Sequence, residues 1–182
     1  FERMKHEKLK TGTKLVKGEV SVGGDTVVAL SMATINAPVK NVVAYLLYHN
    51  PRYHTVLNVE DPGIIGTGVQ ILERTSAHHL VSSTRFNTPT PLTNREVVAS
   101  TIWRKDNEEK FSVVTFSCEH EGCPLDNSNF VRVVVTRAFK LKQNTDNTTS
   151  VEVVGSLNLM GVIPRWINDA LTVPQLAGTP LN

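Results

Sequence analysis

Six strand-like segments follow one another between residues 69 and 160 with no helical pattern between them, and this succession most constrains the fold. The segments cover residues 69–75, 80–86, 96–104, 111–118, 131–141 and 150–160. Each is rich in β-branched or alternating apolar residues, and polar or glycine- and proline-bearing turns separate them. Strands with short connections pair as hairpins, so the sequence predicts an antiparallel meander.

The chain before this meander predicts a strand that leads into a helix. Residues 26–35 are rich in β-branched residues, and the strand signal stops at Pro38. Apolar residues then recur at intervals of three and four, at Val39, Val42, Val43, Leu46 and Leu47. We expect an amphipathic helix of about three turns, with Asn36 as its cap and Pro38 in its first turn.

The chain after the meander returns to helical spacing beyond Gly161, where Pro164 suits a first turn. The apolar residues of this second helical face are Ile163, Trp166, Ile167, Ala170 and Leu171. A long antiparallel sheet with two helices belongs to the α+β class, and a curved sheet must cover its concave face with something apolar. We expect the last helix to be that cover, with an internal cavity beneath it.

Composition and charge exclude several classes of protein. The 182 residues are 40% hydrophobic, as expected of one globular domain. Lysine plus arginine number 19 against 17 acidic residues, which is too balanced for a nucleic-acid binder. No run of about 18 uncharged apolar residues could span a membrane. Only two cysteines are present, which indicates a reducing, cytoplasmic compartment. The sequence starts at Phe1 without a leader pattern, so we expect an excised or processed domain.

Positive charge is concentrated at the beginning of the chain. Residues 1–17 hold six cationic and two acidic side chains, which gives this segment a net charge of +4 and the remainder −2. We expect residues 1–25 to form a basic, helical N-terminal segment and residues 26–182 to form the domain. The segment is either a solvated helix or an arm that touches anionic lipid or another partner.

Enzyme motifs are absent from the sequence. It has no phosphate-binding loop, no nucleophile elbow and no His-Glu-x-x-His motif, and the glycines at 66 and 68 lack the third glycine of a dinucleotide loop. Cys118, His120 and Cys123 are metal-ligating residue types, but zinc needs four ligands and no second pair is evident. A strand end that runs into a surface loop is favoured over a metal site, and we expect no catalytic residues, no metal and no cofactor.

Four stretches, in order, resemble the START (StAR-related lipid transfer) domains. Residues 33–47 resemble the strand that enters the first helix, and residues 89–97 resemble a proline-rich loop followed by an arginine and an acid. Residues 116–125, leading to Val131-Arg132, resemble a His, Pro and Val-Arg pattern, and residues 161–166 resemble a Gly-x-x-Pro entry to the last helix. The third stretch is most similar to the ceramide-transfer members.

The resemblance implies a helix-grip fold, in which a curved antiparallel sheet wraps around a long C-terminal helix and encloses one lipid in an internal tunnel. The last helix and the loop of Pro89, Thr90, Pro91 and Leu92 would form the lid. The ligand-binding residues that it implies are Thr84, Thr101 and Thr115 on the central strands and Ile163, Trp166, Ile167 and Leu171 near or on the last helix. Each threonine could equally be an ordinary strand residue.

The function implied is non-catalytic binding and transfer of a phospholipid, ceramide or sterol-like lipid. The alternative is a ligand-gated regulatory domain, or an enzyme, that uses the same cavity fold. The expected partners are a lipid ligand and, transiently, a membrane surface; we expect no nucleic acid, and a cytoplasmic monomer. From the residues themselves, we expect Arg95 and Arg132 to be structural, because a guanidinium in an apolar strand needs a carboxylate or carbonyl partner.

Overall fold

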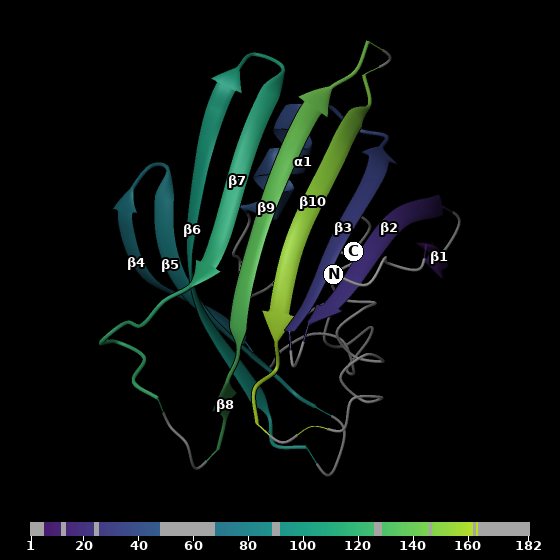
Figure 1. Ribbon diagram of the computed structural model, residues 1–182. Coiled ribbons are helices and arrows are strands. Elements are labelled where there is room, and N and C mark those ends of the chain that lie inside the picture. Colours follow the sequence, from purple (N-terminus) through teal and green to yellow (C-terminus); the bar gives the residue numbers. More distant parts are fainter. Residues whose placement is uncertain are drawn as a thin grey trace.

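A computed structural model describes residues 6–11, 14–23, 26–47, 68–88, 92–125, 129–145, 147–161 and 163. Its strands form one ten-stranded curved sheet of order β1-β2-β3-β10-β9-β7-β6-β5-β4, with β8 beside β6 (Figure 1). The strands are β1 (His6–Thr11), β2 (Lys14–Gly23), β3 (Thr26–Ile35), β4 (Gly68–Ser76), β5 (His79–Phe86), β6 (Arg95–Asn107), β7 (Lys110–Ser117), β8 (Val131–Arg132), β9 (Val134–Gln143) and β10 (Thr149–Asn158). The helix α1 spans Val39–Leu46.

The predicted antiparallel meander is confirmed. Strands β4 to β7 pair in chain order, β9 and β10 form the next hairpin, and β7 pairs with β9. The predicted strand 131–141 is two strands, because β8 pairs in parallel with β6 before Val133 and β9 then joins β7. Strand β10 pairs with β3, so segments from opposite ends of the chain lie side by side.

The expected N-terminal helix is wrong for the described residues of that segment. His6–Thr11 and Lys14–Gly23 are strands, and β2 pairs with β3 from Lys17 opposite Met32 to Gly23 opposite Thr26. Residues 19–22 alternate polar and β-branched side chains, a pattern of period two. The open edge of β3 provides hydrogen-bond partners for such a segment, and cationic composition alone does not favour a helix.

Helix α1 begins where the apolar spacing predicts, but its cap is different from the one expected. Pro38, not Asn36, occupies the N-cap and provides no side-chain cap. The backbone N–H of Val39 instead donates to Oε1 of Gln143 over 2.7 Å, from the end of β9. The helix covers eight residues, fewer than the three turns predicted.

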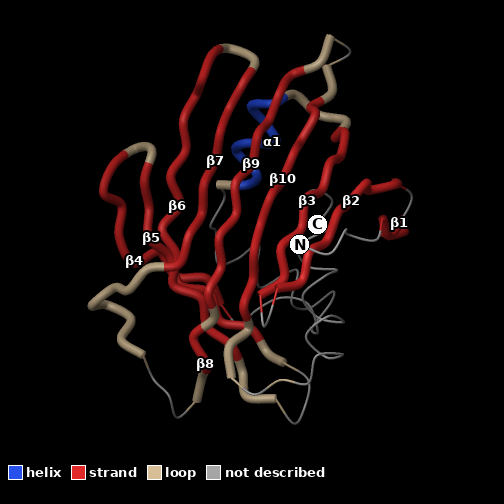
Figure 2. The backbone as a smooth tube through the Cα atoms, in the orientation of Figure 1, coloured by secondary structure: helices blue, strands red, loops and turns tan. Residues whose placement is uncertain are grey.

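One face of the sheet carries α1, and we call it the inner face (Figure 2). Here Val39, Val42 and Val43 of α1 pack on β7, β9 and β10 in the first apolar cluster. A second cluster lies further along β9 and β10 and includes residues of β3 and β6. Its buried members are Ala29, Ala99, Val133, Val135, Leu157 and Leu159. These two clusters divide the inner face into two apolar regions.

Several predicted features lie outside the described residues. These are Pro89, Thr90 and Pro91 of the lid loop and Trp166, Ile167 and Leu171 of the last helix. Among the residues that are described, no helix is long and apolar enough to cross a membrane.

Candidate functional site

A row of residues that includes three polar side chains crosses the inner face between the two apolar clusters. The row is Thr101 on β6, Thr115 on β7, Arg137 on β9 and Gly155 on β10. The register pairs Thr101 with Thr115, Thr115 with Arg137 and Arg137 with Gly155. Paired residues of neighbouring strands project to the same face, so the four positions form one line, which we call the inner polar row.

Two predicted ligand-binding residues meet in this row. The hydroxyl oxygens of Thr101 and Thr115 are 3.0 Å apart and share a hydrogen bond. Thr101 is buried and Thr115 half-buried. A hydroxyl can donate once and accept twice, so each threonine keeps hydrogen-bonding capacity for another group.

The other described candidates lie elsewhere. Thr84 pairs with Val97 and Val69, four residues along β5 from Leu80, the partner of Thr101. Ile163 packs against the second apolar cluster together with Phe86 and Val97. Leu92 is half-buried, and its carbonyl accepts a hydrogen bond from the Thr88 hydroxyl. The structure therefore brings together only two of the predicted threonines.

Arg137 is the member of the row that the sequence analysis missed. Its Nε is buried and has no hydrogen-bond partner. Burial lowers the pKa of its guanidinium from the usual value, because a charged group loses its hydration there. The residues Val133, Val135, Phe139 and Leu141, at every second position around it, are all buried and apolar. This alternation is the signal that could have placed Arg137 on the inner face.

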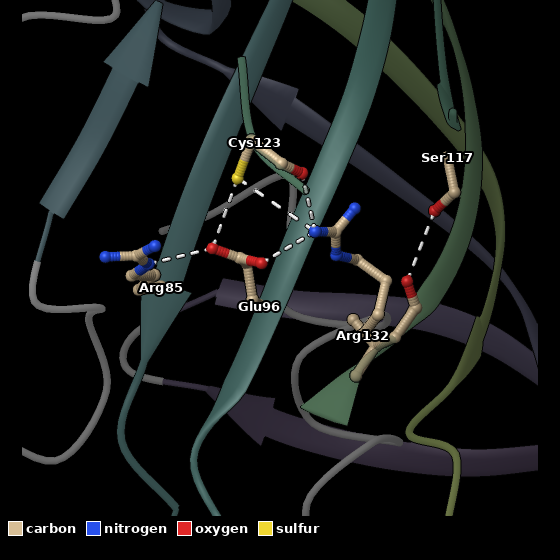
Figure 3. A network of polar contacts seen from close by, with 6 residues as sticks. Arg85, Glu96, Ser117, Cys123 and Arg132 are labelled. Carbon is tan, nitrogen blue, oxygen red and sulfur yellow. Dashed lines mark hydrogen bonds and ion pairs between the residues drawn. The ribbon is translucent and has the colours of Figure 1, made fainter. Parts of the chain in front are cut away.

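A second polar cluster lies on the opposite face, around the carboxylate of Glu96 (Figure 3). Glu96 is 1% exposed and accepts hydrogen bonds from Nε of Arg85 and Nη2 of Arg132, each over 2.8 Å. Sγ of Cys123 donates to it over 3.4 Å, and Arg132 also reaches the Cys123 carbonyl over 3.0 Å. Burial alone would raise the pKa of Glu96, but these hydrogen bonds outweigh it and hold the pKa below the usual value.

The hydrogen bonds of the Glu96 cluster and of Arg95 are those of residues that stabilise the fold. Arg95 is 3% exposed and donates from Nε to the Leu159 carbonyl over 3.0 Å, with further bonds to the carbonyls of Thr93 and Met160. These partners tie the start of β6 to the chain that follows β10. Arg95 and Arg132 thus have the carbonyl and carboxylate partners that the sequence analysis expected.

The loop with Cys118, His120 and Cys123 shows protein-internal contacts. Burial raises the pKa of both thiols, and the nearby Glu96 contributes to the rise at Cys123, so both stay protonated at neutral pH. His120 contacts Glu73 through Nε2 over 3.2 Å. In the described ranges, no three side chains of histidine, cysteine, aspartate or glutamate gather as metal ligands would.

A curved antiparallel sheet with an amphipathic helix against its inner face defines a sheet-and-helix domain of the α+β class. The sequence model of the START domain matches residues 7–173, and this chain belongs to that family. No curated protein matches the sequence.

Solved structures show the same fold at low sequence identity. The human StarD13 (DLC2) lipid transfer and protein localization domain has a TM-score of 0.68 and 17% identity, over 90% of this chain and 79% of that one. Human StAR-related lipid transfer protein 5 has a TM-score of 0.73 and 15% identity, over 93% and 79%. A fragment of a StAR-related lipid transfer protein from Xanthomonas axonopodis has a TM-score of 0.68 and 18% identity, over 96% and 92%.

Proposed function

We propose that this domain holds one lipid molecule against its inner face and exchanges it at membrane surfaces without catalysing a reaction. START domains are known as lipid-binding and lipid-transfer domains, and membership of the family supports the proposal. The observation that carries it is the inner polar row between two apolar clusters. Apolar surface of this kind suits acyl chains or rings, while a few hydroxyls orient a polar head.

The inner polar row and the two apolar clusters also indicate which residues would contact the lipid. Thr101 and Thr115 would hydrogen-bond its polar end, with Thr84 and Ile163 on the walls. We propose that Trp166, Ile167 and Leu171 complete the apolar lining and that the last helix and residues 89–92 act as the lid. The likeness of residues 116–125 to ceramide-transfer members has no support in the structures compared above, so no ceramide specificity is proposed.

A non-catalytic role is favoured over an enzyme by the chemistry of the inner face. In the part of the chain that the structure describes, this face presents hydroxyls and arginines but no carboxylate or histidine beside them that could act as a general base. We further propose that the domain works as a cytoplasmic monomer that meets membranes transiently.

Native mass spectrometry tests the proposal. The delipidated protein is incubated with liposomes of mixed lipid composition and then separated from them. We expect a one-to-one adduct of protein and lipid, with the lipid recovered chemically unchanged. Failure of every lipid class to bind would refute the carrier proposal, and conversion of the bound lipid would favour an enzyme.

A further inference from the structure

In the described part of the chain, Arg137 makes no hydrogen bond or ion pair, unlike Arg95 and Arg132. Arg95 donates to carbonyl oxygens, and Arg132 pairs with Glu96 although its Nε is unbonded. For Arg137, the described residues provide neither a hydrogen-bond acceptor for Nε nor any charge that offsets the effect of burial. Holding an unpaired charge away from water costs several kcal/mol, so a folded domain rarely keeps one without use for it.

The register neighbours of Arg137 on the inner face are small or carry a hydroxyl. On the β10 side its register partner is Gly155, which has no side chain, and on the β7 side it is Thr115. On β3, opposite Val153 and diagonal to Gly155, the hydroxyl of Ser31 is another buried group without a hydrogen-bond partner. Arg137 itself keeps part of its surface exposed while its Nε is buried.

The described strands place no acidic side chain on the inner face to neutralise Arg137. Along the described parts of β3, β10, β9, β7, β6 and β5, the residues in register on this face are apolar, hydroxyl-bearing, amide or cationic. Glu96 and Glu152 lie on the opposite face. The described strands therefore provide no counter-charge for Arg137, and we infer that an anion from outside the sheet fills this role.

We propose that Arg137 binds the acidic head group of a lipid, a carboxylate or a phosphate monoester, with the hydroxyl of Thr115 as a second donor. The inference rests on the proposed lipid-binding function and names its substrate class. A planar guanidinium matches two oxygens of a carboxylate or phosphate, and such charge-assisted hydrogen bonds are about twice as strong as neutral ones. The apolar clusters on both sides of the row accommodate the chain attached to that head group.

The first experiment uses the wild-type protein with matched pairs of lipids. Delipidated protein is mixed with phosphatidylcholine vesicles that contain oleic acid or, in its place, oleyl alcohol. A second pair of vesicles contains dioleoylphosphatidic acid or dioleoylglycerol. We expect each acidic lipid to be bound at least about tenfold more tightly than its uncharged counterpart, equivalent to about 1.4 kcal/mol. Bound lipid is counted by native mass spectrometry.

The second experiment changes the charge on either face of β9. Arg137→Met keeps an unbranched side chain comparable to the apolar stem of arginine but removes the guanidinium, and it should abolish the preference for acidic lipids while the uncharged ones still bind. The matched control is Lys140→Met, because Lys140 is exposed on the opposite face of the same strand. It should leave the preference unchanged. Arg137→Lys keeps the charge and should retain part of the preference.

Thermal unfolding of the lipid-free variants separates a binding role from a structural one. Removal of an unpaired buried charge should leave the Tm of Arg137→Met equal to or above that of the wild type. A marked fall in Tm would mean that the chain itself neutralises Arg137, and it would overturn the inference. Acetate and inorganic phosphate, added alone, should not raise the Tm of the wild type; a rise equal to that with phosphatidic acid would show that the ligand is a small anion.

The lipid pairs also distinguish this inference from the proposed function. Equal binding of acidic and uncharged lipids would overturn the role of Arg137 and leave lipid binding intact. Binding of neither kind would refute lipid binding itself.

Discussion

Arg132 donates a hydrogen bond from Nη2 to Oε2 of Glu96 over 2.8 Å, although the two residues are 36 positions apart in the chain. Glu96 belongs to β6 and Arg132 to β8, which pairs with β6 in parallel. The bond thus ties the short β8 to the middle of the antiparallel sheet. Arg85, on the next strand, shares the same carboxylate.

Glu96→Gln should destabilise the protein. The change leaves the buried end of Arg132 without its counter-charge, and breaking a buried pair by removing one partner costs about 3 kcal/mol or more. Denaturant unfolding would measure the loss. The matched control is Glu152→Gln on β10, because Glu152 is exposed and should change stability by less than about 0.5 kcal/mol. Equal effects of the two changes would contradict the prediction.

Protonation of the Glu96 carboxylate should lower the stability of the protein in acid. Because the pKa of Glu96 is lower in the folded protein than in the unfolded chain, the unfolded state takes up the proton first. The contribution of Glu96 is complete above the ordinary glutamate pKa of about 4.3 and is lost as the pH falls through the folded value. Unfolding free energies measured across this range should fall less steeply for Glu96→Gln than for the wild type. A slope unchanged by the substitution would exclude Glu96 as the cause.

Arg95→Leu and Arg132→Leu should each lower the Tm. Each replacement leaves buried acceptors without their donor, at a cost of about 2 kcal/mol, or about 4–8 °C in Tm. Lys140→Leu, which removes an exposed cation from β9, is the control and should shift the Tm little. Differential scanning calorimetry is the measurement. If either variant kept its Tm and changed its choice of lipid, that arginine would belong to the binding site.

The threonine pair predicts a difference between single and double substitutions. Thr101→Val leaves the hydroxyl of Thr115 without its partner and should cost about 1 kcal/mol. The double change Thr101→Val with Thr115→Val removes both partners and should cost no more than the single one. Lipid affinity should fall in the double variant and stay unchanged in Thr136→Val, an exposed position on the outer side of β9. Full affinity in the double variant would make these two ordinary strand threonines.

Chelation of divalent metal should leave stability and lipid uptake unchanged. The thiols of Cys118 and Cys123 have raised pKa values and Cys123 donates to Glu96, whereas a zinc site needs thiolates. Thermal unfolding with and without a chelator tests this, with elemental analysis of the untagged protein beside it. A stoichiometric metal would contradict it.

Local sequence patterns were sufficient to predict most of the strands and the helix α1. The alternation and turn residues after residue 68 predicted the hairpins, and the spacing of Val39, Val42 and Val43 predicted α1, because both patterns depend only on neighbours along the chain. The basic N-terminal segment was predicted wrongly, because β2 takes its partners from β3 and composition does not show where an open strand edge lies. The cap of α1 comes from Gln143, which is 104 residues away.

The candidate site also contains some residues that the sequence indicated and others whose contacts depend on the fold. The resemblance to START domains implied Thr101 and Thr115, which hydrogen-bond to each other in the structure. It did not imply Arg137, although the apolar residues that alternate with it in the sequence indicate its face. Glu96 was predicted only as part of a motif, and its two arginine partners come from other strands.

Periods of two and of three to four residues were enough to locate the strands after residue 68, the helix α1 and the side chains that share a face. Which of these side chains meet depends on the tertiary structure. It put Arg137 between Thr115 and Gly155, and Arg132 beside Glu96, because the register between strands depends on the pairing of the whole sheet and not on any one strand.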